Sequence, residues 1–148
     1  MKLETKHFGC IDIEEENIIC FPEGLPGFED TRKYVLLGKN DEESPFRWLQ
    51  CVDRPDVAFA IIDPRLIKPD YVAHIESADI EILDIKEEDK ALVYVILVVP
   101  EDITKMTANL KAPVIINPFN NMGKQVVLEK GDYGIKHYVF EELRKAGG

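Results

Sequence analysis

Apolar residues in this chain come in short runs, closely separated by proline, glycine and charged residues. Runs of about four to eight apolar residues bounded by turn formers are typical of β-strands, whereas a helix needs a longer periodic pattern. Many short strands with short polar turns favour an all-β, mostly antiparallel fold. Closure into a small barrel would remove exposed strand edges. We therefore expect a single barrel-like domain over residues 1–148, with one or two short helices.

Residues 91–99 are apolar without alternation, which predicts a central strand covered on both faces. Residues 117–123 are rich in Asn, Pro and Gly, which predicts a hairpin loop. Residues 76–85 fit a short helix and a strand equally well, and the pattern from Tyr138 onwards predicts a short terminal helix. The other expected strands are residues 9–13, 33–37, 46–52, 58–62, 114–116 and 125–128.

The formal net charge is −10, so the surface potential should repel phosphate backbones and direct nucleic-acid binding is not expected. Acidic clusters at residues 14–16, 41–43 and 87–89 are typical of solvated turns between strands. Charge interrupts the N-terminal residues, and no apolar run approaches the ~20 residues of a membrane helix, so we expect neither a signal peptide nor a membrane span.

The cysteines Cys10, Cys20 and Cys51 are odd in number and widely spaced, which indicates neither a disulfide framework nor a zinc site. We expect free thiols, a cytoplasmic location, and no metal or cofactor.

Motifs that carry known catalytic mechanics, such as phosphate-binding glycine loops or the zinc-binding H-E-x-x-H, are absent from the sequence. The one mildly suggestive grouping is Asp63, Asp70 and His74, which also fits two turn pairs and a surface imidazole. We therefore expect no enzyme activity, no catalytic residues and no small-molecule substrate.

Residues 21–29 read F-P-E-G-L-P-G-F-E, with prolines that fix φ and glycines that permit sharp bends. This pattern predicts a rigid, built loop. Its apolar residues Phe21, Leu25 and Phe28 either plug one end of the core or form a docking surface for a partner.

Residues 104–117 read T-K-M-T-A-N-L-K-A-P-V-I-I-N. Asn109 either caps a turn or faces the backbone of a partner, and Leu110 would then be the apolar anchor. Pro113 removes a strand donor, so residues 109–112 should form an irregular edge. In the following loop we expect Phe119 to be tucked inward and Met122 to be exposed.

These two segments, together with S-P-F-R-W-L-Q at residues 44–50, A-F-A-I-I-D-P at 58–64 and G-K-Q-V-V-L at 123–128, resemble the flagellar assembly factor FliW family in the same order and spacing. The resemblance implies a small β-barrel-like cytoplasmic protein that binds newly made flagellin. It also implies alternative binding of the carbon storage regulator CsrA, an RNA-binding repressor of flagellin translation. The partner-binding residues expected on this basis are Phe21, Leu25, Phe28, Asn109, Leu110 and Met122.

Two features depart from the family pattern: Cys51 replaces an expected serine, and residues 134–137 lack the usual proline. The implied mechanism is partner exchange, in which release of flagellin frees the protein to capture CsrA and lift its repression. The alternative is a small acidic barrel that binds a ligand or oligonucleotide. The acidity and the absence of interleaved arginine and aromatic residues speak against it.

Overall fold

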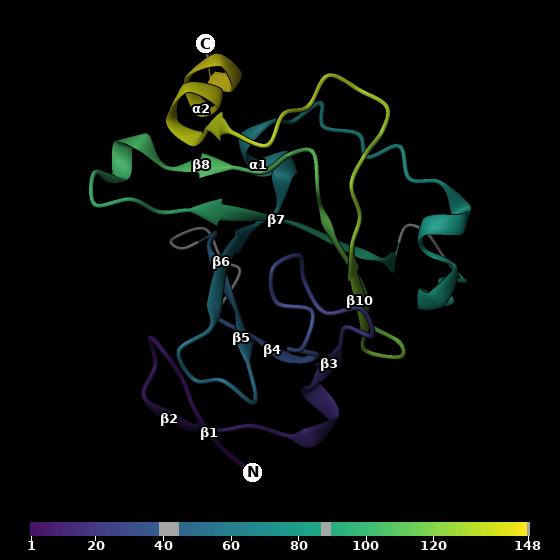
Figure 1. The fold of residues 1–148 in the computed structure, drawn as a ribbon. Helices are drawn as coiled ribbons and strands as arrows, with labels where there is room; N and C mark the ends of the chain where they lie inside the picture. The colour runs from purple at the N-terminus through teal and green to yellow at the C-terminus, as the bar shows by residue number, and fades with distance from the viewer. Residues whose placement is uncertain (39–44, 87–89, 148) are drawn as a thin grey trace.

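The computed structural model describes residues 1–38, 45–86 and 90–147. Its core is a barrel of seven strands in the order β7-β6-β5-β4-β3-β10-β9, closed by pairing of β9 with β7 (Figure 1). The described strands are β1 (Lys2–Glu4), β2 (Cys10–Asp12), β3 (Ile19–Cys20), β4 (Lys33–Leu37), β5 (Arg47–Cys51), β6 (Ala58–Ile62), β7 (Leu92–Val98), β8 (Thr107–Ala108), β9 (Val114–Asn117), β10 (Met122–Gln125) and β11 (His137–Tyr138). The described helices are α1 (Pro64–Ile67), α2 (Val139–Gly147) and the 3₁₀ turns η1 (Glu15–Asn17), η2 (Ser77–Asp79), η3 (Glu81–Leu83) and η5 (Ile103–Lys105).

Neighbouring strands of the barrel are antiparallel except for β3 and β10, which pair in parallel. Strands β8 and β11 extend the sheet beyond the barrel, next to α2 at the C-terminal end (Figure 1). Strands β1 and β2 form a separate hairpin near the N-terminus. The expected all-β, mostly antiparallel barrel with short helices is confirmed.

Strand β7 shows why one apolar segment can serve two layers. Tyr94 and Ile96 pack with the cluster inside the barrel, whereas Val95 and Leu97 join a second cluster. That second cluster includes Ile67 of α1 and Val139 of α2. Because successive side chains of a strand point to opposite faces, helices outside the barrel must cover the outward set. The prediction of a strand buried on both faces is confirmed.

One local expectation was wrong, and one left open between helix and strand is resolved as short helical turns. Strand β10 ends at Gln125 and does not extend over residues 125–128. Pro113 faces Val126 and has no N–H, so the regular ladder stops there and single bonds such as Val126 N to Pro113 O continue it. Residues 76–85 contain neither a strand nor an α-helix but the two 3₁₀ turns η2 and η3.

Helix α1 was not expected, although its signals are present in the sequence. Asp63 is its N-cap, with Oδ1 accepting from Arg65 N at 2.9 Å, and Pro64 occupies the first helical turn. The expected terminal helix is α2, which starts at Val139 directly after β11.

Several further expectations concern charge and cysteine. The acidic cluster at residues 14–16 lies exposed at η1, as expected, whereas those at 41–43 and 87–89 lie outside the described residues. All three cysteines are free, with Cys51 buried and Cys10 and Cys20 exposed. Across the described ranges, no helix has both the length and the apolar character needed to cross a membrane.

A close contact between a glycine and an aromatic ring joins the two parallel strands. Phe21 follows β3 and is fully buried, with its ring lying on Gly123 of β10. A Cβ atom at Gly123 would lie 2.5 Å from Cε1 and 2.6 Å from Cζ of that ring. Only glycine therefore lets β10 approach β3 with Phe21 in place.

We expect Gly123→Ala to destabilise the fold by about 1–3 kcal/mol, because the added methyl group overpacks the core against a buried ring. Urea unfolding followed by tryptophan fluorescence at Trp48 measures this difference. Gly134→Ala is the matched control, since the nearest atom to its added Cβ is 3.6 Å away. Equal urea midpoints for the two variants would contradict the assignment.

Candidate protein docking surface

The loop at residues 21–29 is a plug in the barrel. Phe21 packs edge-on against Tyr34 with centroids 5.3 Å apart, and Leu25 is also fully buried. Leu25 and Phe28 pair through two backbone hydrogen bonds, which close a tight turn. Phe28 is partly exposed and packs edge-on against Phe59. Of these three predicted partner residues, only Phe28 reaches the surface.

Asn109 and Leu110 lie in the irregular connection between β8 and β9. The side-chain Oδ1 of Asn109 accepts from the amides of Lys111 and Ala112 at 3.2 and 3.1 Å, so the expected turn-capping role is confirmed. Leu110 is fully buried, and its carbonyl accepts from the Tyr71 hydroxyl at 2.8 Å. Leu110 is therefore a core residue and is not accessible as a surface anchor.

The hairpin between β9 and β10 is held by asparagine side chains. Asn117 is buried; its Nδ2 donates to the Leu83 carbonyl at 2.9 Å, and its Oδ1 accepts from Phe119 N at 3.0 Å. Asn120 Nδ2 donates to the same Leu83 carbonyl, and Asn121 Nδ2 donates to the Glu16 carbonyl. The hairpin is thus fixed to both η3 and η1.

Phe119 stands on this fixed hairpin with 75% of its surface exposed. The expectations for this loop were therefore reversed: Phe119 is outside, and Met122 is partly buried against the cluster around Leu83, Ile115 and Val126. The side-chain bonds of Asn117 turn the loop tip away from the core, a signal that composition alone does not carry. A large exposed ring on a hairpin whose backbone is fixed is a candidate interface anchor, because aromatic side chains are enriched among interface hot spots.

A groove of about 570 Å³ lies outside the barrel, where the extended residues 71–76 and the 3₁₀ turns pass over β7. Most of its lining residues have apolar side chains, although polar atoms, many of them in the backbone, make up nearly half of the exposed lining, and the rim carries Arg65. None of the partner-binding residues predicted from the sequence lines this groove. Its lining residues are Asp63, Pro64, Arg65, Tyr71, Val72, Ala73, Ile75, Ile80, Ile85, Ala91, Leu92, Val93, Tyr94 and Ile115.

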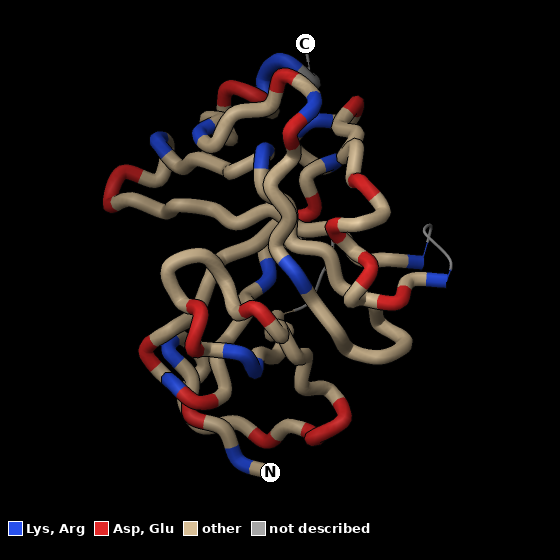
Figure 2. Tube along the Cα trace, turned by 45° about the vertical axis from the view of Figure 1, so that its right-hand side comes forward, with Lys and Arg blue, Asp and Glu red and all other residues tan. Residues whose placement is uncertain are grey.

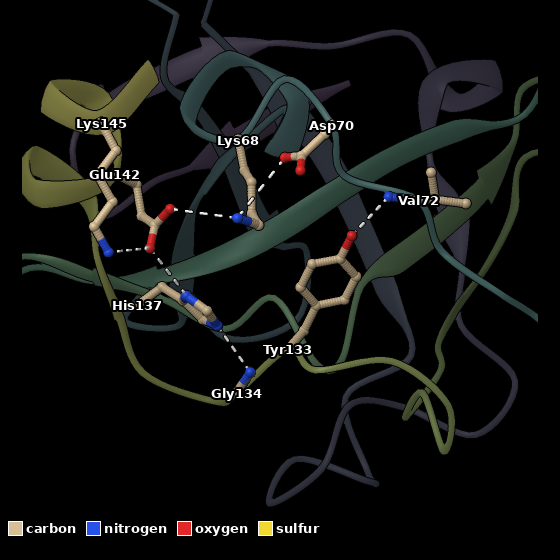
Figure 3. A network of polar contacts seen from close by, with 8 residues as sticks. All are labelled: Lys68, Asp70, Val72, Tyr133, Gly134, His137, Glu142 and Lys145. Carbon is tan, nitrogen blue, oxygen red and sulfur yellow. Dashed lines mark hydrogen bonds and ion pairs between the residues drawn. The ribbon is translucent and has the colours of Figure 1, made fainter. Parts of the chain in front are cut away.

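A polar network next to the groove fixes the C-terminal helix (Figure 3). Glu142 of α2 lies 3.8 Å from Lys68 Nζ and 3.4 Å from His137 Nδ1. His137 Nε2 accepts from Gly134 N at 2.8 Å, so the ring proton is on Nδ1 and faces the carboxylate. Tyr133 joins the same segment to residues 71–76, because its hydroxyl accepts from Val72 N at 2.9 Å. The network holds the C-terminal segment against the groove wall.

The structure does not bring Asp63, Asp70 and His74 together through any contact within the described chain. Asp63 caps α1, Asp70 forms an exposed ion pair with Lys68 at 3.7 Å, and His74 is exposed. Among the described residues there is also no group of three or more His, Cys, Asp or Glu placed to hold a metal ion.

The barrel interior is filled by its own side chains, including Phe21, Tyr34, Leu49 and Ile61. The groove described above is lined by residues that lie over the outside of β7, such as Val72, Ala73 and Ile75. This arrangement gives little room for a ligand or oligonucleotide in the barrel, which was the alternative interpretation of the sequence.

Comparison with known proteins identifies the family. The model of the family described as FliW protein matches residues 2–139. The chain belongs to the FliW family. A curated relative, the flagellar assembly factor FliW of Thermoanaerobacter pseudethanolicus, is 48% identical over 146 residues, covering 99% of this chain and 97% of the relative. The corresponding FliW of Bdellovibrio bacteriovorus is 39% identical over 145 residues, covering 98% of this chain and 82% of the relative.

The fold agrees with this assignment. A solved structure titled as the crystal structure of the flagellar assembly factor FliW superposes with a TM-score of 0.86 at 38% identity. The match covers 94% of this chain and 96% of that chain. The resemblance of the sequence fragments to the FliW family is therefore confirmed over nearly the whole length.

We expect Tyr71→Phe to cost about 1–3 kcal/mol, because the buried Leu110 carbonyl loses its hydrogen-bond donor. Burial also raises the pKa of the Tyr71 hydroxyl above its ordinary value of 10.0. The unfolded chain then releases this proton first, so the stability due to Tyr71 is full below about pH 10 and falls as the pH rises further.

Urea unfolding between about pH 9 and about pH 11 measures both effects. The loss of stability on raising the pH should be shallower in Tyr71→Phe than in the wild type, although Tyr34, whose pKa burial also raises, leaves a residual slope. Tyr138→Phe, at an exposed position, is the control and should follow the wild-type curve. Parallel curves for Tyr71→Phe and the wild type would contradict the pKa argument.

Proposed function

We propose that this chain is a cytoplasmic flagellar assembly factor that binds flagellin as a chaperone and, alternatively, the carbon storage regulator CsrA. Capture of CsrA would relieve its repression of flagellin translation. The proposal extends the family assignment, which rests on a match over residues 2–139 and on relatives named flagellar assembly factor. The proposed role involves no covalent reaction and requires only surfaces that recognise other polypeptides.

The observation that best supports a protein-binding role is the exposed Phe119 on a hairpin fixed by Asn117, Asn120 and Asn121. A flexible loop would lose backbone entropy on binding, whereas the backbone of this hairpin is already fixed by its hydrogen bonds. Aromatic side chains of this kind dominate the binding energy of protein interfaces. Phe119 is thus our leading candidate anchor, in addition to the partly exposed Phe28, Asn109 and Met122 proposed from the sequence.

Isothermal titration of the full chain with purified flagellin, and separately with purified CsrA, tests the proposal. We expect both to bind the wild type, and Phe119→Ser to weaken at least one of them by about 30-fold, the effect of a hot spot worth about 2 kcal/mol. Val127→Ser is the matched control, because Val127 is also exposed and apolar but lies outside the hairpin. Absence of binding to both proteins would overturn the proposal.

Partner exchange requires that the two clients bind exclusively. Flagellin then competes with CsrA for this chain, and its export shifts the population toward CsrA capture. If CsrA capture acts away from the RNA face, the effect on RNA is an allosteric coupling that is reciprocal by linkage. Titrating flagellin into the preformed CsrA complex measures whether one displaces the other.

Charge can contribute to the release of RNA. Glu14, Glu15 and Glu16 are exposed at η1, and Figure 2 shows acidic segments gathered around the N-terminal end of the molecule. Acidic side chains held close to a basic RNA-binding surface would repel the incoming phosphate backbone.

We expect reversal of these three glutamates to lysine to change CsrA affinity modestly but to reduce RNA displacement severalfold at low salt, as measured by gel shift. Reversal of the exposed Glu101, Glu129 and Asp132 gives the same change of net charge elsewhere. RNA displacement that is equal for both triple variants and the wild type would refute the electrostatic contribution.

A further inference from the structure

The ladder between β6 and β7 stops early, and the reason is visible in the sequence. Its last pair is Ile62 with Val95. The next residues, Asp63 and Pro64, begin helix α1 and leave the sheet, and Pro64 has no N–H to donate. The first residues of β7 therefore pair with β9 on one side, and no strand of residues 1–38, 45–86 or 90–147 pairs with them on the other.

The direction of each backbone group of β7 follows from the alternation of an antiparallel ladder. Asn109 N donates to Ile96 O, so Ile96 points its N–H and C=O toward the β8 and β9 side. Tyr94 and Leu92 must then point the same way, and Val95 and Val93 the opposite way. Val95 meets Ile62 there. Val93 points its N–H and C=O at the place that Pro64 has vacated.

That place is the groove of about 570 Å³ described above, and Val93 is one of its lining residues. In the described part of the chain, no hydrogen bond from another residue reaches Val93 on this side. The opposite wall is the extended segment 71–76, which is not in a sheet. Ile75, Ile80 and Ile85 complete an apolar surface beside the open edge.

We infer that this groove receives an extended segment of a client polypeptide, which adds a short strand to the open edge of β7 at Val93. Backbone donors and acceptors of a strand edge are matched best by another backbone, and the neighbouring apolar wall takes alternate side chains of the segment. The groove is lined by one acidic and one basic residue, and the Asp63 carboxylate is occupied as the N-cap of α1. Arg65 is exposed at the rim and makes no ion pair with a described residue, so an acidic side chain of the segment would pair with it.

The occupant we assign is a segment of flagellin, and in this respect the inference rests on the proposed function. A chain held before its assembly can present an extended segment with free backbone groups.

Amide hydrogen exchange followed by NMR, with and without saturating flagellin, tests this directly. We expect exchange at the Val93 amide to slow by at least about tenfold in the complex, because it gains a hydrogen bond. The amides of Leu92 and Tyr94 already face β9 and serve as internal references in the same strand. Groove filling by Ala73→Trp should weaken flagellin binding tenfold or more, whereas Val98→Trp, exposed at the other end of β7, should not.

Flagellin binding that leaves Val93 exchange and the Ala73→Trp affinity unchanged would overturn the groove assignment and keep the proposed function. Protection of Val93 by CsrA but not by flagellin would also overturn it. If flagellin does not bind the wild-type chain at all, both the assignment and the flagellin part of the proposed function fail.

Discussion

Closure of the barrel depends on the contact between Phe21 and Gly123. The parallel pairing of β3 with β10 consists of one residue pair, Met122 with Cys20, which is too little to hold two strands by backbone bonds alone. The buried ring of Phe21 spans the same junction and packs on Tyr34 of β4. All the other pairings between neighbouring strands of the barrel are antiparallel ladders of more than one residue pair. The loop at residues 21–29 therefore has a structural role in the barrel, whatever it also binds.

Hydrogen bonds from side-chain amides hold the irregular segments that lie between the short strands. Gln50 is fully buried; its Nε2 donates to the carbonyls of Cys51, Pro55 and Val57, and its Oε1 accepts from Lys6 N at 3.0 Å. This one residue joins the N-terminal hairpin to the barrel wall. Asn109 and Asn117 do the same for the connections around β9. Because a buried amide left unpaired is costly, each of these residues ties one irregular segment to one geometry.

The sequence was sufficient for the parts of the fold that depend on local pattern. Strands β4 and β6 match their predicted ranges because apolar runs and turn residues bound them sharply. Strands β1, β3, β8 and β11 were missed, since two or three residues give no periodic signal. The site was less predictable: the position of Phe119 depends on bonds from Asn117 to η3, 34 residues earlier in the chain. Likewise, Leu25 and Leu110 look like anchors in sequence and are core residues in space.

The early departure of β6 at Pro64 also bears on self-association of the chain. A strand edge flanked by apolar side chains can pair with another copy of the same chain, which is the usual first step of aggregation. The overhanging residues 71–85 restrict access to that edge, and the net charge of −10 keeps copies apart. The excess of acidic residues thus acts as a colloidal safeguard for an exposed edge, and this protection weakens as the pH approaches the isoelectric point near 4.8.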